Sequence, residues 1–428
     1  MQTLLEWKNS KGKKPLLVKG ARQIGKTFIL REFGKQNYES VVELNFSLNE
    51  NHRTFFNGNL SVKEICRKIS VSPEFDGVKF IDGKTLFIFD ELQDCGDART
   101  ALKSFAEDGR FDVIASGSML GVAYKQTRSI PVGYESQVEM FSMDFEEYLW
   151  AKGLSEENIE YFRTAFEKKE QLDEFMNNRM LELVREYMIV GGMPAVVNKF
   201  IQTNNFSEVH NEQMEIINSY LDDIAKYAPT AEKPKARNCY LSLPKQLAKE
   251  NKKFQFSVVE KNGTARKFEN SIEWLRDAGL VKLCMNVSTP TFPLVAYTQA
   301  GYYKIYGTDI GIVNAMFGFE IKKEIFDNTL KGSMKGGIYE NLIADILLKK
   351  NLPLYYFKQS ENTQEIEFLY TQNSDIIPIE VKAGNSQTVS LNEFIKRYAP
   401  PHALKLVTGN MGAVDTKVTM PLYMAMFL

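Results

Sequence analysis

The chain has 428 residues, of which 44% are hydrophobic and 25% are charged, and its formal net charge is −1. This composition is that of a folded globular protein and excludes a disordered or fibrous chain. The length predicts about two to four domains, and the balanced charge gives no whole-chain electrostatic reason to bind nucleic acid or an anionic membrane.

Cysteine and histidine usage narrows the chemistry further. The four cysteines are far apart and form no CxxC pair, and no two of the three histidines are close in sequence. These spacings argue against a disulfide framework, a thiolate or histidine metal site and a Ser-His relay, so we expect any metal to be bound by oxygen atoms. Residues 1–14 lack a signal-peptide pattern, and the longest uncharged run, 283–303, is rich in proline and polar residues. We therefore expect a cytoplasmic protein without a membrane span.

The first predicted elements are a buried strand at 15–20 and a helix at 26–36, with Phe28, Ile29 and Phe33 on one helical face. The turn between them matches G-x-x-x-x-G-K-[ST], the pattern of a phosphate-binding loop, in which backbone N–H groups and a helix N-terminus face an anion. We expect Lys26 to reach the β- and γ-phosphates of a nucleotide and Thr27 to bind Mg²⁺. The alternative is an incidental glycine turn. The predicted nucleotide-binding residues are Gly20, Ala21, Arg22, Gln23, Ile24, Gly25, Lys26 and Thr27.

The segment 84–96 predicts a second buried strand, Leu86 to Phe89, which ends in two acidic residues. This is a Walker B pattern. Asp90 is expected to hold Mg²⁺, and Glu91 is expected to polarise an attacking water molecule. The alternative is that both residues only cap the helix that follows.

A third apolar run, 111–120, ends in Ser116-Gly117-Ser118. Ser116 is a candidate sensor of the γ-phosphate and is counted with Lys26 and Glu91 as catalytic; the alternative is a turn that ends the strand. The alternation of strands and helices predicts an α/β fold, a parallel sheet with helices on both faces. The arginine that would stabilise the leaving phosphate is left open among Arg31, Arg99, Arg110 and Arg128, or an arginine of a neighbouring subunit.

Residues 145–228 carry apolar residues at three- and four-residue spacing, which predicts helices. Residues 191–194, Gly-Gly-Met-Pro, predict a turn between two of them, and 231–237 has the composition of a linker. We expect the helices to form a lid.

Residues 229–315 predict helices within 243–250 and 266–281, the second with Phe268, Ile272 and Leu275 on one face, and then strands at 280–287 and 293–299. This arrangement resembles a winged helix-turn-helix. Between Lys245 and Lys267 lie seven basic and two acidic residues, which could neutralise DNA phosphates. The alternative is a solvated helical face in a domain that contacts protein.

The last third predicts a helix at 336–350 that contains Glu340, followed by strands at 352–359, 365–372 and 376–384. An acid on a helix, an acid on a hairpin and E-x-K on the next strand are the layout of a restriction-type nuclease, in which carboxylates hold Mg²⁺ and a lysine steadies the attacking hydroxide. Glu340, Glu367, Glu380 and Lys382 occupy those places. The alternative is a structural remnant used for binding.

Nearly the full length of the chain resembles a family of AAA-type P-loop ATPases of bacteria and archaea that carry a C-terminal restriction-endonuclease-like domain. The resemblance implies ATP binding by residues 20–27, Mg²⁺ at Asp90, water activation at Glu91 and a winged helix. The family usually has aspartate where this chain has Glu367, which weakens the expectation of nuclease activity. The segments that carry the resemblance are GARQIGKT, FDELQ, IASGSML, DFEEYLWAKG (144–153), YMIVGGMPAVV (187–197), YLDDIAKYA (220–228) and PIEVKAG (378–384).

Four segments are therefore predicted: a P-loop core at 1–150, a helical lid at 151–228, a winged helix-turn-helix at 229–315 and a restriction-endonuclease-like domain at 316–428. The leading hypothesis is a Mg²⁺-dependent ATPase whose nucleotide state controls the attached modules. Two alternatives remain: an ATP-regulated, metal-dependent DNA nuclease, and a non-hydrolysing switch that binds ATP to recruit protein or DNA. ATP and Mg²⁺ are the expected cofactors. DNA, a protein partner or a second copy of the chain are the candidate partners, and no membrane is expected.

Overall fold

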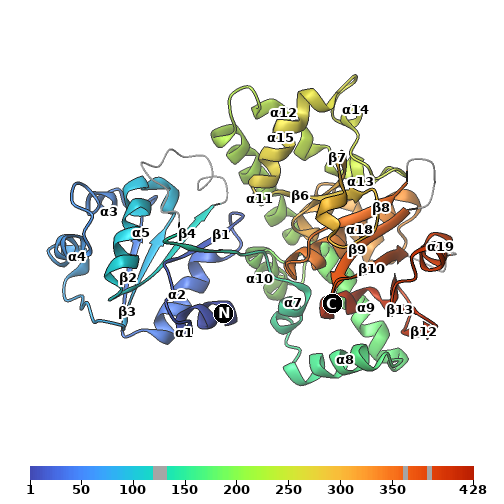
Figure 1. Cartoon of the computed structure of the whole chain (residues 1–428), viewed down its shortest axis with the longest axis horizontal. Coiled ribbons are helices and arrows are strands. Elements are labelled where there is room, and N and C mark those ends of the chain that lie inside the picture. The colour runs from blue at the N-terminus through green and yellow to red at the C-terminus, as the bar shows by residue number, and fades with distance from the viewer. Residues whose placement is uncertain (119–132, 360–364, 383–387) are drawn as a thin grey trace. The chain divides into compact units, whose positions relative to one another are not determined.

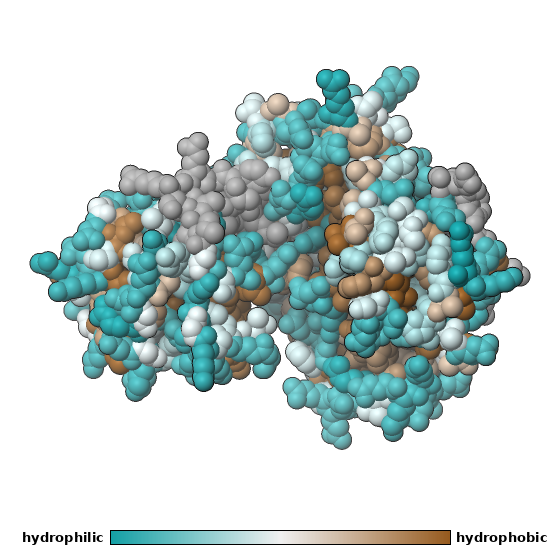
Figure 2. All heavy atoms as spheres, viewed as in Figure 1, coloured by the Kyte–Doolittle hydropathy of each residue, from teal (hydrophilic) through white to brown (hydrophobic). Residues whose placement is uncertain are grey.

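A computed structural model describes residues 1–118, 133–359, 365–382 and 388–428. The chain divides into two compact units, residues 1–141 with 277–279 and residues 142–276 with 280–428 (Figure 1). Hydrophilic side chains cover most of the surface seen in Figure 2, and hydrophobic residues come to it in small patches. Within the described ranges, no helix is both long and apolar enough to cross a bilayer.

The first unit is built on a five-stranded sheet in which every neighbouring pair is parallel. The order is β2, β3, β4, β1, β5, so β1, which leads into the predicted phosphate-binding loop, lies between β4 and β5. The predicted parallel α/β sheet is confirmed. The strands are β1 (Leu16–Gly20), β2 (Ser40–Asn45), β3 (Thr85–Asp90), β4 (Asp112–Ser118) and β5 (Ser136–Glu139).

Helices cover both faces of this sheet (Figure 1). One buried cluster joins Leu86 and Ile88 to α1 (Gln2–Asn9) and α2 (Lys26–Asn37). The other joins Phe87 and Phe89 to α4 (Val62–Ser70) and α5 (Gly96–Asp108), because successive strand residues point to opposite faces. Three short elements complete the unit: α3 (Asn51–Thr54), η1 (Pro73–Phe75) and η2 (Leu92–Asp94).

One side chain of α2 departs from the expected helical face. Phe28 is 72% exposed, whereas Phe33 is fully buried. Leu30 and Phe33 pack in the buried cluster with the sheet, and Gly34 is also buried. The expectation that Phe28 shares a face with Phe33 is therefore wrong, because the two positions differ by five residues and a helix repeats every 3.6.

The second unit begins with the helices that the spacing of residues 145–228 predicts. The predicted turn at 191–194 lies between α9 and α10, except that Pro194 is already the first residue of α10. The predicted linker at 231–237 is wrong: α12 begins at Lys233, and its proline falls in the first turn, where a missing N–H costs nothing. These helices are α7 (Phe145–Ala151), α8 (Glu156–Lys168), α9 (Glu174–Val190), α10 (Pro194–Thr203), α11 (Phe206–Tyr227) and α12 (Lys233–Leu241).

Helix α9 of the predicted lid contacts α16 of the predicted winged helix, and it also contacts α17 and η4 of the last predicted segment. Residues from all three predicted C-terminal segments therefore share one core. Phe268, Ile272 and Leu275 of α15 are buried together as expected. The elements are α13 (Leu243–Leu247), α14 (Phe256–Val259), α15 (Ala265–Asp277), α16 (Ile310–Ala315), α17 (Glu320–Phe326), α18 (Gly332–Lys349), α19 (Val389–Tyr398) and η4 (Leu422–Phe427).

An eight-stranded mixed sheet runs through the second unit in the order β12, β13, β11, β10, β9, β8, β6, β7. The predicted wing strand at 293–299 is wrong: 294–297 is a short helical turn, η3 (Leu294–Tyr297), and the strand follows it. The hairpin of β6 and β7 pairs through β6 with β8, so it forms an edge of the large sheet. The strands are β6 (Val281–Val287), β7 (Thr298–Gly307), β8 (Tyr355–Lys358), β9 (Glu365–Gln372), β10 (Asp375–Lys382), β11 (Ala403–Val407), β12 (Gly412–Val414) and β13 (Lys417–Pro421).

A buried polar cluster anchors the first residues of the second unit. Ser142 donates a hydrogen bond to Asp309 at 2.7 Å, and the backbone N–H of Met143 donates to the carbonyl of Gly192 at 2.8 Å. Lys349 Nζ donates to the Met143 carbonyl at 3.1 Å. A Cβ atom on Gly192 would lie 1.9 Å from that carbonyl oxygen, so only glycine fits at this turn. Residues 142 and 143 are thus tied to three segments that are far apart in sequence, at Gly192, Asp309 and Lys349.

This cluster predicts that the second unit is more stable at pH 5 than at pH 7.5. Asp345 accepts hydrogen bonds from Lys349 Nζ at 2.9 Å and Tyr187 OH at 3.2 Å, and Asp309 is the second carboxylate near that lysine. Burial, opposed by Lys349, raises the pKa of Asp345 to about 7. Between about pH 4 and 7 the folded state therefore holds a proton that unfolded aspartate has lost, so the free energy of unfolding falls as pH rises.

The measurement is urea unfolding of the full chain at both pH values. Asp345→Asn, which cannot ionise, should reduce the pH dependence of the second unit's unfolding midpoint. An equal pH dependence in the native and Asp345→Asn proteins would contradict this assignment.

Candidate functional site

The predicted phosphate-binding loop connects β1 to α2 in the first unit. Gly20 ends β1, and a Cβ atom there would lie 2.3 Å from the carbonyl oxygen of Met140. Gly25 precedes the helix with φ of 90°, and Gln23 has φ of 65°. Such left-handed conformations favour glycine and produce the tight turn that brings the first N–H groups of a helix toward an anion.

Three side chains donate hydrogen bonds to the carboxylate of Asp90, which is 2% exposed at the end of β3. Thr27 Oγ1 lies 3.2 Å and 3.0 Å from its two oxygens, Asn45 Nδ2 lies 2.8 Å from Oδ2, and Ser116 Oγ also donates to Oδ1. The strands β2, β3 and β4 are parallel, so the residues at their carboxyl ends meet at one edge of the sheet. The structure therefore brings Thr27, Asp90 and Ser116 together, as the sequence predicts.

The chemistry of this donor set fits a magnesium ion. A hydroxyl and a carboxylate are hard oxygen ligands of the kind that Mg²⁺ takes from proteins when substrate phosphates supply the rest. Thr27 and Asp90 are the residues that would hold it. Ser116 and Asn45 orient the carboxylate from the neighbouring strands.

Lys26 is 7% exposed and lies against its own loop. Its Nζ donates to the carbonyl oxygens of Gly20 at 3.1 Å and Ala21 at 2.7 Å. Burial lowers the pKa of Lys26 to about 8, and the nearby Glu91 and Asp90 carboxylates oppose that effect. The ammonium group thus lies within electrostatic reach of both acids, in a position to bind phosphate oxygens.

Glu91 directly follows β3 in a left-handed conformation with φ of 56°. A non-glycine residue in this conformation is uncommon and typical of residues that a site holds in place. Gln93 Nε2 donates a hydrogen bond to its carboxylate. The other amide atom, Gln93 Oε1, is buried and has no hydrogen-bond partner among the described residues. Glu91 is thus held by one neighbour beside Asp90, which agrees with a role in orienting water.

Sequence reasoning missed Asn45. It is paired with Asp90 across β2 and β3, and its Oδ1 accepts hydrogen bonds from the backbone of Ser47 and Leu48. The loop therefore holds the amide in one orientation, with Nδ2 toward Asp90. The available signal was the short apolar pattern at 41–44, Val-Val-Glu-Leu, which is followed directly by this polar residue.

The described candidates for the phosphate-stabilising arginine are all engaged elsewhere. Arg31 makes two hydrogen bonds to Glu43, at 2.8 Å and 2.6 Å, and Arg110 pairs with Asp108. Arg99 pairs with Glu135 at 3.3 Å. Arg128 lies outside the described residues. The identity of this arginine stays open.

The four predicted nuclease-like residues come from α18, β9 and β10. Lys382 Nζ lies 3.1 Å from Glu367 and 3.4 Å from Glu380, so the structure brings these three together. Glu340 instead accepts hydrogen bonds from Lys304 at 3.1 Å and Tyr306 OH at 3.0 Å.

A second lysine, Lys304, forms an ion pair with Glu340, and the sequence did not predict this lysine in the cluster. Lys304 of β7 is 1% exposed and pairs with both Glu340 and Glu365. Burial raises the pKa of Glu367 to about 7 and also raises that of Glu380.

Two carboxylate oxygens of this cluster, Glu367 Oε2 and Glu380 Oε2, are buried without a hydrogen-bond partner in the described chain. Even so, the described residues contain no group of three Asp, Glu, His or Cys side chains that could hold a metal ion. The arrangement is an ion-pair cluster with two lysines among the acids. It does not fit the metal site expected for Glu340, Glu367 and Glu380.

A comparison with known protein families supports the predicted P-loop ATPase fold of the first unit. The family model of the AAA domain matches residues 12–149. A domain of unknown function, DUF8612, matches 181–323, which spans the predicted boundary at 228 and 229, and another, DUF4143, matches 335–423. The winged-helix and restriction-endonuclease-like assignments therefore stay predictions. No curated protein matches the sequence.

Solved structures also resemble the chain at low identity, among them the following three. A Walker-type ATPase of Pyrococcus abyssi is 14% identical over 74% of this chain and 94% of that chain, with a TM-score of 0.41. AMPPCP-bound DnaA from Aquifex aeolicus is 12% identical over 64% and 86%, with a TM-score of 0.29. Cdc6p from Pyrobaculum aerophilum is 13% identical over 77% and 92%, with a TM-score of 0.25. The assignment of residues 12–149 to an AAA domain depends on the family model and the parallel sheet.

Proposed function

We propose that the AAA-type P-loop ATPase domain at residues 12–149 binds ATP with Mg²⁺ and hydrolyses it, and that its nucleotide state controls the second unit. The observation that carries the proposal is the contact between Thr27 and Asp90, because it joins the start of α2 to the acidic end of β3. Those are the two elements that must meet around one nucleotide and its cation.

Each site residue has a role that follows from its place. The amides of residues 20–27 and Lys26 bind the phosphates, while Thr27 and Asp90 hold Mg²⁺, which would neutralise phosphate charge. Glu91, held by Gln93, orients the attacking water and accepts its proton. Ser116 responds to the γ-phosphate; its hydrogen bond to Asp90 supports this role.

Residues 140–143 connect the phosphate-binding loop to the second unit, and they transmit the nucleotide state. Met140 N donates to the carbonyl of Lys19 at 2.7 Å, and the Met140 carbonyl packs against Gly20 of the phosphate-binding loop. Two residues later, Ser142 and Met143 are anchored by Asp309 and Gly192 in the second unit. A shift of the loop on nucleotide binding would therefore pull on an anchored segment. DNA and protein remain the candidate targets of that control.

The test is phosphate release by the full chain and by Glu91→Gln. We expect hydrolysis to fall by about a hundredfold or more while the affinity for ATP is retained, because the amide cannot accept the proton of water. Glu39→Gln is the matched control, since Glu39 is an exposed acid of the same unit that pairs with Lys84. Hydrolysis that persists at the native rate in Glu91→Gln would refute this role. ATP binding without hydrolysis in the native chain would favour the non-hydrolysing switch.

A further inference from the structure

A basic hollow lies at one end of the large sheet of the second unit, where β6, β7 and β8 are neighbours. Its volume is about 720 Å³. Its lining contains three basic residues, four side-chain amides and two tyrosines but no acid. The lining residues are Asn251, Lys253, Asn286, Ser288, Gln299, Tyr302, Tyr356, Lys358, Gln359 and Arg397.

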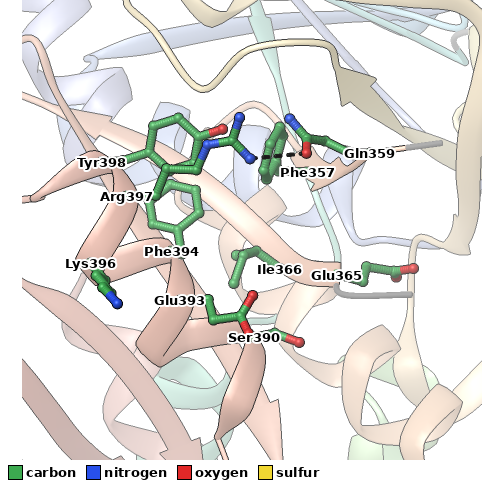
Figure 3. Close-up of a pocket in the computed structure, with 10 residues that line it drawn as sticks. All are labelled: Phe357, Gln359, Glu365, Ile366, Ser390, Glu393, Phe394, Lys396, Arg397 and Tyr398. Atoms are coloured by element: carbon green, nitrogen blue, oxygen red, sulfur yellow. Dashed lines mark hydrogen bonds between the residues drawn. The ribbon is translucent and has the colours of Figure 1, made fainter. Parts of the chain in front are cut away.

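An aromatic hollow of about 410 Å³ adjoins it (Figure 3). Phe357 comes from β8, and Phe394 and Tyr398 from α19, and their ring centroids lie within 4.7–5.9 Å of one another. The remaining lining residues are Gln359, Glu365, Ile366, Ser390, Glu393, Lys396 and Arg397. Figure 3 shows Arg397 extending toward Gln359, and its Nη1 donates to Gln359 Oε1 at 3.1 Å. Since both residues line both hollows, this pair is the junction between them.

The floor of the basic hollow is held rigidly. Asn286 Nδ2 donates to Gln299 Oε1 at 2.6 Å and to the Lys358 carbonyl at 3.1 Å, and the Lys358 N–H donates back to Asn286 Oδ1 at 3.0 Å. These bonds tie β6, β7 and β8 side chains into one surface. A rigid floor favours a ligand that is recognised by the positions of its groups.

The cations of the basic hollow differ in their partners. Lys358 pairs with Glu365 at 3.0 Å. Lys253 and Arg397 have no carboxylate within ion-pair distance in the described part of the chain. Lys253 Nζ lies 3.4 Å from the ring centroid of Tyr302, and Tyr302 is 46% exposed. Two cations and an exposed ring are thus available to a ligand that carries both negative charge and flat rings.

We propose that the two hollows form one binding site for single-stranded nucleic acid. The basic hollow takes phosphates through Lys253 and Arg397, with Tyr302 as a stacking surface, and the aromatic hollow takes a base. Amides of the floor and the Glu393 carboxylate offer partners to base edges. A duplex keeps its bases stacked inside and cannot fill an aromatic hollow, whereas a single strand can place an unstacked base there. An acidic peptide would use the cations alone. The site is independent of ATP hydrolysis.

The basic stretch that the sequence singled out contributes to this site through one residue. Lys253 lines the hollow, whereas Lys252 is 8% exposed and donates to the Ser333 carbonyl at 2.9 Å, and Lys267 pairs with Glu260 at 2.6 Å. Lys245 and Lys249 are exposed and lie outside the lining. The two locations for nucleic-acid binding can therefore be separated by substitution.

The test is fluorescence anisotropy of a labelled single-stranded 12-mer of mixed sequence with the full chain. Arg397→Ala and Lys253→Ala should each weaken binding and reduce the salt dependence by about one ion. Tyr302→Ala should weaken binding about fivefold or more at every salt concentration, since stacking is not screened. Arg179→Ala is the matched control, because Arg179 is an exposed arginine on α9 paired with Glu182.

Several outcomes would overturn the proposal. These are no binding by the native chain, equal loss in Arg179→Ala, loss only in the double variant Lys245→Ala and Lys249→Ala, and equally tight binding of polyglutamate or of a duplex of the same sequence. ATP hydrolysis by the hollow variants, measured without nucleic acid, should remain at the native rate. A hollow variant that loses nucleic-acid binding but hydrolyses ATP at the native rate shows that the ATPase site is intact.

Discussion

Asp90→Asn is expected to lower ATP hydrolysis by about 10²–10³-fold, in line with the loss of one group that stabilises charge in a transition state. The carboxylate is buried and accepts hydrogen bonds from Thr27, Asn45 and Ser116. Asparagine keeps the size of the side chain but removes the charge that would hold Mg²⁺. It also replaces one acceptor oxygen by an N–H₂ group, so either Asn45 or Ser116 loses its acceptor.

The measurement that separates the loss of metal from the loss of the fold is ATP affinity with and without Mg²⁺. Asp90→Asn should bind ATP in the presence of EDTA nearly as well as the native chain but gain little from added Mg²⁺. Asp82→Asn, an exposed acid of the same unit, is the control and should behave like the native protein. Hydrolysis within about threefold of the native rate at saturating Mg²⁺ would exclude Asp90 from the cation site.

The first unit could be predicted because its signals are local. The glycine pattern, the strand before it and the helix after it are adjacent in sequence, so one segment specifies the loop. Thr27, Asp90 and Ser116 lie far apart in sequence. A general rule nevertheless places the carboxyl ends of neighbouring parallel strands at one edge. The structure confirms that proximity, and the catalytic roles stay predictions.

What the sequence did not predict depends on tertiary contacts. Asn45 looks like any polar residue after a strand until the pairing of β2 with β3 places it beside Asp90. The hairpin of β6 and β7 reads as an isolated wing, because its pairing with β8 joins residues distant in sequence. For the same reason, three acids and a lysine in the right order suggested a metal site, although Lys304 of β7 neutralises one of the acids.

Lys304→Met is expected to destabilise the second unit by about 3–5 kcal/mol, the usual effect of removing one partner from a buried ion pair. Lys304 is 1% exposed and pairs with Glu340 and Glu365, and the Tyr306 hydroxyl also donates to Glu340. Methionine fills the same space but leaves the buried Glu340 carboxylate and the half-buried Glu365 carboxylate with less compensation. Urea unfolding of the full chain, followed by tryptophan fluorescence, would measure the loss. Lys331→Met, at an exposed position before α18, is the control.

The dependence of this loss on pH identifies its cause. Despite burial, Lys304 and Lys358 hold the pKa of Glu365 at about 2, below the value of about 4.3 for an unfolded glutamate. The stabilisation from this depressed pKa is present above the unfolded value and is lost as pH falls toward about 2. The difference between Lys304→Met and the native chain should therefore be largest near pH 7 and smaller near pH 3.5. Adding Glu340→Gln to Lys304→Met should recover part of the stability, because one uncompensated charge is removed. If Mg²⁺ instead restored Lys304→Met to native stability, the carboxylates would form a cation site after all, and the nuclease alternative would regain support.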